Sequence, residues 1–188
     1  VIVCMCPPTY IESMRNHSPK RSTDSHSPSQ SETYFWLVED NEGFRTNIRD
    51  LINETAELTC DLAVSSCEDA LAHLESDAAP DILLMDIGLP GMDGIEGIRQ
   101  VKSIAPSIQV IMLTVFDDSD KIFQAICAGA SGYLLKSAPP DDIIRSLTDI
   151  LKGGAPMNAQ IARKVLDMFA DMAAPKGNYE ITDAEKEI

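Results

Sequence analysis

Residues 81–94 read DILLMDIGLPGMDG and place a short apolar run directly before an acidic side chain. Only Ile, Leu and Met occur in residues 82–85, which is typical of a strand that is buried on both faces of a sheet. Asp86 follows this run at once, and Pro90 with the two glycines after it favours a tight loop. The stretch therefore predicts a buried strand whose carboxyl end presents a carboxylate to a loop.

The same alternation of apolar runs and helical patterns extends to both sides of this stretch. Further strands are predicted at residues 34–38, 58–64, 108–113 and 132–135. Apolar side chains at helical spacing separate the strands, after Phe44 and within residues 66–74, 94–104, 121–128 and 141–151. Strands that alternate with helices predict an α/β fold, a doubly wound sheet of five parallel strands with helices on both faces.

The rest of the chain has a different composition. Residues 1–33 include a stretch rich in Ser, Pro, His and Asn without helical or strand periodicity, so we expect a disordered leader before an ordered domain at 34–153. Residues 154–178 are expected to form an amphipathic helix, at 159–172, and a linker. We expect the last ten residues, 179–188, to begin a further domain that the chain cuts short.

Composition excludes several classes of protein. The net charge of −15 argues against direct binding of this chain to a nucleic-acid backbone, which would need clustered Lys and Arg. No apolar run of roughly 18 residues is present, so no membrane-spanning helix is expected. The five cysteines are odd in number and scattered, which indicates free thiols in a reducing cytoplasm rather than a disulfide framework.

Polar side chains stand where four of the predicted strands end. These are Glu39 and Asp40, Asp86, Thr114 and Lys136. Because the carboxyl ends of parallel strands meet at one edge of a sheet, we expect the five side chains to converge there.

The chemistry of this set points to phosphoryl transfer. Three carboxylates in one place repel one another unless a cation neutralises them, and oxygen ligands suit Mg²⁺. Lys136 adds a compact positive charge and Thr114 a hydroxyl donor. A carboxylate nucleophile, a metal ion, an ammonium and a hydroxyl together form a site that positions and neutralises a phosphoryl group.

Four segments give the chain a family resemblance. They are VEDN at 38–41, residues 81–94 already quoted, VIMLT at 110–114 and AGASGYLLK at 128–136. Over residues 34–152 the chain resembles the receiver domain of a two-component response regulator. The resemblance implies a flavodoxin-like receiver fold and a phosphoacceptor switch rather than an enzyme that turns over external substrates.

The resemblance also implies a role for each residue of the site. Asp86 would accept a phosphoryl group from a sensor histidine kinase. Mg²⁺ would be held by Asp40 directly, by Glu39 through water, by Asp86, and by the carbonyl of Gly88. The phosphoryl oxygens would be held by Thr114 and Lys136. The ring of Tyr133 would swing inward when Thr114 moves toward the phosphoryl group.

Two residues depart from the family pattern. Ser137 follows Lys136 where many receivers have a proline after a cis peptide bond, and a cis bond before a non-proline residue costs about 2.5–4 kcal/mol. Val115 follows Thr114 where receivers often have alanine, so we expect narrower access to Asp86 and slower gain or loss of the phosphoryl group.

The last residues, YEITDAEKEI at 179–188, resemble the opening of a LuxR-type helix-turn-helix domain. With the preceding helix, this resemblance indicates the NarL/FixJ subfamily of transcription regulators. It implies a cytoplasmic protein that dimerises on phosphorylation and binds DNA through a C-terminal domain that is missing from this chain.

Three other interpretations are weighed against this one. A haloacid dehalogenase-type phosphatase needs a second acid two residues after its nucleophile, where Gly88 stands. A nucleotide-binding module would need a glycine-rich loop between a strand and a helix, and neither G-x-G-x-x-G nor a P-loop follows the first strand. A receiver-like module that works without phosphorylation is kept open by Val115.

Overall fold

Strands and helices alternate through the part of the chain that the structure, a computed structural model, describes, which is residues 33–76 and 78–173. The strands are β1 (Thr33–Val38), β2 (Leu58–Val64), β3 (Ile82–Met85), β4 (Gln109–Thr114) and β5 (Gly132–Leu135). The helices are α1 (Glu42–Asn53), α2 (Cys67–Ser76), α3 (Gly94–Ile104), α4 (Ser119–Ala128), α5 (Pro140–Leu151) and α6 (Ala159–Ala173).

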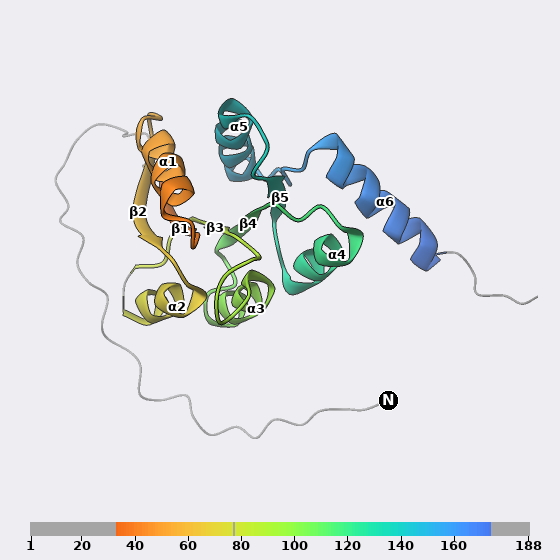
Figure 1. Ribbon diagram of the computed structural model, residues 1–188, viewed down its shortest axis with the longest axis horizontal. Helices are drawn as coiled ribbons and strands as arrows, with labels where there is room; N and C mark the ends of the chain where they lie inside the picture. Colours follow the sequence, from red (N-terminus) through yellow and green to blue (C-terminus); the bar gives the residue numbers. More distant parts are fainter. Residues whose placement is uncertain (1–32, 77, 174–188) are drawn as a thin grey trace, which may run out of the picture. The chain divides into compact units, whose positions relative to one another are not determined.

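The strands form one parallel sheet in the order β2-β1-β3-β4-β5. Helices α1 and α5 cover one face of the sheet, and α2, α3 and α4 cover the other (Figure 1). This is the predicted doubly wound α/β fold, and its strand order is that of the flavodoxin-like receiver fold.

Two apolar cores lie on the two faces of the sheet because successive strand side chains point to opposite sides. On β1, Phe35 and Leu37 pack in the core beneath α1 and α5. Trp36 and Val38 pack in the other core, with α2, α3 and α4. All four of these side chains are at most 4% exposed, which explains why β1 is apolar without alternation.

Most of the predicted boundaries agree with the structure within two residues, and β2, β3, β5 and α3 agree at both ends. Strand β1 begins one residue before the predicted position, because Thr33 is its first residue. Thr33 pairs with Leu58, and its N–H donates to the carbonyl of Glu57 at 3.0 Å. Backbone pairing sets this boundary, so a polar side chain does not prevent it. The predicted leader before Thr33 and the residues after Ala173 lie outside the described part of the chain.

Helix α6 lies beside α4 and continues the core on that face (Figure 1). Ile161 is fully buried in the core that contains Ile122 of α4. Just before α6, Met157 forms an isolated bridge with Tyr133 of β5, and the Tyr133 N–H donates to the carbonyl of Pro156 at 2.9 Å. No helix within the described residues has the length and apolar character needed to cross a membrane.

Candidate functional site

The sheet brings three carboxylates to one place. Glu39 follows β1 and Asp86 follows β3, and both are buried, whereas Asp40 is exposed. Backbone hydrogen bonds fix the two buried acids, since Glu39 N–H donates to Val64 and Asp86 N–H donates to Val38, each at 3.0 Å. One carboxylate oxygen from each of Glu39, Asp40 and Asp86 lies within 4.8 Å of the other two. The neighbouring strands β1 and β3 therefore form the acidic cluster.

Lys136 joins this cluster from the end of β5. Its Nζ lies 2.6 Å from Oε2 of Glu39 and 2.7 Å from Oδ2 of Asp86, and its side chain is only 14% exposed. The backbone N–H of Lys136 donates to the carbonyl of Thr114 at 2.8 Å, which ties the end of β5 to the end of β4. Four of the predicted site residues thus lie together, namely Glu39, Asp40, Asp86 and Lys136.

Burial and the neighbouring charges have opposite effects on the pKa values of Lys136 and Glu39. Burial alone lowers the pKa of Lys136, but its hydrogen bonds to Asp86 and Glu39 outweigh burial and raise that pKa above the usual value. Burial raises the pKa of Glu39, and the hydrogen bond from Lys136 offsets this only in part. Lys136 contacts two carboxylates, which outweigh its burial, whereas Glu39 shares that one cation with Asp86 and its burial prevails.

The acidic cluster fits a divalent cation. Oδ2 of Asp86 accepts a hydrogen bond from Lys136, but Oδ1 is buried without a hydrogen-bond partner among the described residues. A buried carboxylate oxygen without a donor is costly unless a cation or a reaction partner reaches it. Three carboxylates with oxygen atoms this close match the preference of a hard cation for oxygen ligands.

The three other predicted residues lie around this cluster. Gly88 adjoins Asp86, since a Cβ atom on Gly88 would lie 3.7 Å from Oδ2 of Asp86. Thr114 is fully buried at the end of β4, and its Oγ1 accepts a hydrogen bond from the Phe116 N–H at 3.4 Å. Tyr133 is fully buried, and its hydroxyl donates to the carbonyl of Phe116 at 2.9 Å.

Two aromatic residues that were not predicted to belong to the site lie at its border. The Phe116 ring would lie 3.3 Å from a Cβ atom on Gly88, so it flanks the loop that follows Asp86. The Phe44 ring centroid is 5.0 Å from Nζ of Lys136, a cation–π distance. An aromatic residue in the polar loop VFDDSD, two positions after Thr114, is the signal that could have identified Phe116.

The two departures from the family pattern have simple structural outcomes. The Val115 side chain is 68% exposed, whereas its neighbour Phe116 is the residue beside Gly88. The expected narrowing at position 115 therefore has no support from this geometry. No peptide bond within the described residues is cis, including the bond between Lys136 and Ser137.

Comparisons with known proteins agree with this geometry. A family model described as the response regulator receiver domain matches residues 35–148, more than half of the chain. The chain is 32% identical over 145 residues to the transcriptional regulatory protein LnrK of Bacillus subtilis (strain 168), covering 77% of this chain and 66% of that protein. It is 30% identical over 129 residues to the response regulator UvrY of Escherichia coli (strain K12), covering 69% of this chain and 59% of that protein.

A solved structure gives the same result. The two-component response regulator of the LuxR family from Aurantimonas sp. SI85-9A1 superimposes with a TM-score of 0.68 at 28% sequence identity, covering 74% of this chain and 99% of that chain. The chain spans less than two thirds of the length of the curated relatives named above. On the sequence match, the fold and the acidic cluster together, the chain belongs to the response regulator receiver domain family, and its relatives are transcriptional regulators of the LuxR and NarL type.

Proposed function

We propose that Asp86 accepts a phosphoryl group from the phosphohistidine of a sensor histidine kinase. The observation that carries this proposal is the contact of Lys136 with both Glu39 and Asp86, next to a carboxylate oxygen of Asp86 that receives no hydrogen bond from the described part of the chain. A buried nucleophile with one free oxygen and an adjacent ammonium can attack phosphorus and then hold the transferred oxygens.

The transfer step needs few protein groups. A carboxylate oxygen of Asp86 attacks the phosphorus atom, the bond between phosphorus and the imidazole nitrogen breaks, and that nitrogen keeps the bonding electrons. The product is an acyl phosphate on Asp86, which carries roughly two negative charges in place of the single charge of the carboxylate. Lys136, which contacts Asp86, and the hydroxyl of Thr114, at the end of the strand that pairs with β3, then bind the phosphoryl oxygens.

The acidic cluster would hold Mg²⁺. Asp40 and Asp86 are the direct carboxylate ligands in this proposal, Glu39 acts through water, and the carbonyl of Gly88 completes the protein's share. Bound Mg²⁺ supplies positive charge that Lys136 alone cannot provide for three carboxylates and a phosphoryl group. The donor set and the unpartnered oxygen of Asp86 support this assignment.

The proposed effect of phosphorylation is on dimerisation and on DNA binding. A two-component receiver has a histidine kinase as its partner and is a phosphoacceptor switch rather than a classical enzyme. We propose that phosphorylation draws Thr114 toward Asp86 and favours the inward position of Tyr133, which changes dimerisation and the activity of a C-terminal DNA-binding domain. Cytoplasmic transcription regulation is the setting that the named relatives suggest.

Intact mass spectrometry after incubation with acetyl phosphate and Mg²⁺ tests the acceptor. We expect the protein to gain the mass of one phosphoryl group, and the Asp86→Asn variant to gain none. The Asp141→Asn variant is the matched control, because Asp141 is an exposed acid in the first turn of α5. Uptake by Asp86→Asn at the rate of the control would contradict the proposal.

A further inference from the structure

Helix α6 is attached to the loop between β4 and α4 by two polar side chains. Nε2 of Gln160 donates a hydrogen bond to Oδ2 of Asp117 at 3.0 Å. Nζ of Lys164 donates to the backbone carbonyl of Asp117 and lies 3.5 Å from Oδ2 of the same residue. Gln160 and Lys164 are four residues apart, so one face of α6 presents both donors to a single loop residue.

The loop that α6 contacts belongs to the candidate site. Asp117 directly follows Phe116, whose carbonyl accepts the hydroxyl of Tyr133 and whose N–H donates to Thr114. The Phe116 ring also flanks Gly88, next to the Asp86 carboxylate. Asp117 is therefore three residues along the backbone from Thr114, and its neighbour Phe116 links it to Tyr133 by one hydrogen bond. The position of Asp117 thus bears on both residues.

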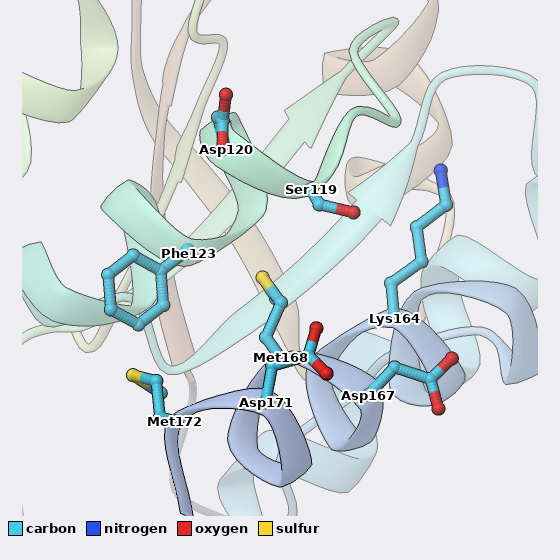
Figure 2. A pocket seen from close by; sticks show the side chains of 8 residues that line it. All are labelled: Ser119, Asp120, Phe123, Lys164, Asp167, Met168, Asp171 and Met172. Carbon is cyan, nitrogen blue, oxygen red and sulfur yellow. The ribbon is translucent and has the colours of Figure 1, made fainter. Parts of the chain in front are cut away.

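The packing of α6 is uneven along its length. Ile161, near its start, is fully buried, whereas Met168 is partly buried and Met172 is 55% exposed. Between α4 and α6 lies a groove lined on one side by Ser119, Asp120 and Phe123 and on the other by α6 side chains (Figure 2). Lys164 extends from α6 at the end of this groove where α4 begins (Figure 2). The first half of α6, next to the loop, is therefore the part that packs most closely against the domain.

We infer that Lys164 and Gln160 are positioning residues for the phosphorylation site, acting through Asp117. The described arrangement has Tyr133 buried and bonded to the loop, which is the inward position associated above with phosphorylated Asp86. Docked α6 holds the loop in that arrangement, so docking favours phosphorylation. Since coupling between two sites is reciprocal, phosphorylation must in turn strengthen the docking of α6. This inference rests on Asp86 as the phosphoacceptor.

The Lys164→Met variant tests the first direction, because it removes the ammonium and keeps an unbranched apolar chain. The matched control is Arg163→Met, since Arg163 is the adjacent cation and forms an exposed ion pair with Asp167, at 3.3 Å. We expect Lys164→Met to weaken the binding of beryllofluoride with Mg²⁺ about fivefold and to slow phosphorylation by acetyl phosphate, and Arg163→Met to leave both unchanged. Gln160→Leu should lower the rate in the same direction.

A double-mutant cycle separates positioning from simple loss of stability. If Lys164 acts through Asp117, the Asp117→Ala variant and the double variant should be slowed to a similar extent, not multiplicatively. Urea unfolding of each variant measures stability independently. A rate for Lys164→Met equal to that of Arg163→Met, with the wild-type protein phosphorylated, would overturn the inference and leave Asp86 as the acceptor.

Hydrogen exchange tests the reciprocal direction. Beryllofluoride with Mg²⁺, a mimic of the phosphoryl group, should slow exchange of α6 amides in the wild-type protein and have less effect on them in Lys164→Met. Unchanged α6 exchange in a wild-type protein that binds beryllofluoride would contradict the coupling. If Asp86→Asn gains a phosphoryl group as fast as the wild-type protein does, the acceptor assignment itself fails, which is a separate result.

Discussion

Gly94, the first residue of α3, lies against the backbone of Asp86 and Ile87. A Cβ atom at this position would lie 1.9 Å from the backbone carbonyl oxygen of Asp86, far inside any allowed contact. The Gly94 N–H also donates to the carbonyl of Ile87 at 3.0 Å. Glycine is therefore required so that α3 can hold the backbone on both sides of the Asp86 peptide group.

Replacing Gly94 by alanine should destabilise the fold and displace Asp86. We expect a loss of about 3 kcal/mol or more in the free energy of unfolding, because the clash is with backbone and cannot be relieved by a side-chain rotation. Gly43→Ala is the control, since its Cβ would meet only Asn41 at 3.5 Å and alanine favours the helix α1. Urea unfolding measures both, and equal stability of the two variants would contradict this account.

Lys136 should stabilise the fold in a manner that depends on pH and on Mg²⁺. Lys136→Met leaves Glu39 and Asp86 buried without their cation, so we expect a loss of about 3 kcal/mol in the presence of EDTA. Added Mg²⁺ should restore part of this loss. If Mg²⁺ has the same effect on Lys136→Met as on the wild-type protein, the ion and the ammonium do not share these carboxylates.

The alkaline limb of stability follows from the raised pKa of Lys136. Its ion pairs contribute fully below the usual lysine value of 10.5, and their contribution is lost as the pH rises through the higher pKa of the folded protein. The free energy of unfolding of the wild-type protein should therefore fall in this range more steeply than that of Lys136→Met. Urea titrations at a series of pH values compare the two slopes.

Some residues of the site could be predicted from the sequence and others could not. Asp86 and Lys136 each directly follow an apolar run, so the rule that parallel strands end at one edge was enough to place them together. The contacts of Phe116 with Gly88 and of Lys164 with Asp117 depend on the path of a loop and on the docking of a helix. No local pattern specifies either of these, so the sequence analysis did not include them in the site.

Among the helices, α4 began two residues earlier than predicted. Asp118 is its N-cap, and the Asp118 carboxylate accepts a hydrogen bond from the Lys121 N–H at 2.9 Å. The apolar period that served for prediction does not include the first polar turn, which a cap defines instead. Strand β1 shows the same effect at Thr33, where backbone pairing alone extends the strand.

Loss of this cap should weaken α4 and the loop before it. We expect Asp118→Ala to lower the free energy of unfolding by about 1 kcal/mol, and Asp118→Asn to have little effect because asparagine is an equally good cap. Urea unfolding gives both values. If both variants lose the same stability, the negative charge of Asp118 matters more than its hydrogen bond.

The whole domain should respond to the ion that the acidic cluster would hold. Binding to the folded state alone stabilises a protein by mass action, and Mg²⁺ at a hundred times its dissociation constant would add about 2.7 kcal/mol. We expect a dose-dependent rise in melting temperature that Asp40→Asn removes. Asp50→Asn, an exposed acid on α1 that pairs with Arg49, should retain the rise. Loss of the rise in both variants would indicate a general charge effect.

The alternation of strands and helices was sufficient to predict the sheet and its two layers, because each element buries its own stripe. The strand order and the choice among the competing functions needed more. The family match favours the receiver over a phosphatase or a nucleotide-binding module. The placement of α6 against α4 depends on interhelical packing, which an amphipathic period alone leaves open.

The bridge between Met157 and Tyr133 also bears on how the molecule avoids self-association. Strand β5 lies at the border of the sheet, where unpaired backbone groups offer a template for another chain. The Tyr133 N–H is instead satisfied by Pro156, and the Pro156 ring lies where any side chain on Gly132 would collide with it. The segment before α6 thereby occupies part of this border, where a strand of another chain would otherwise pair.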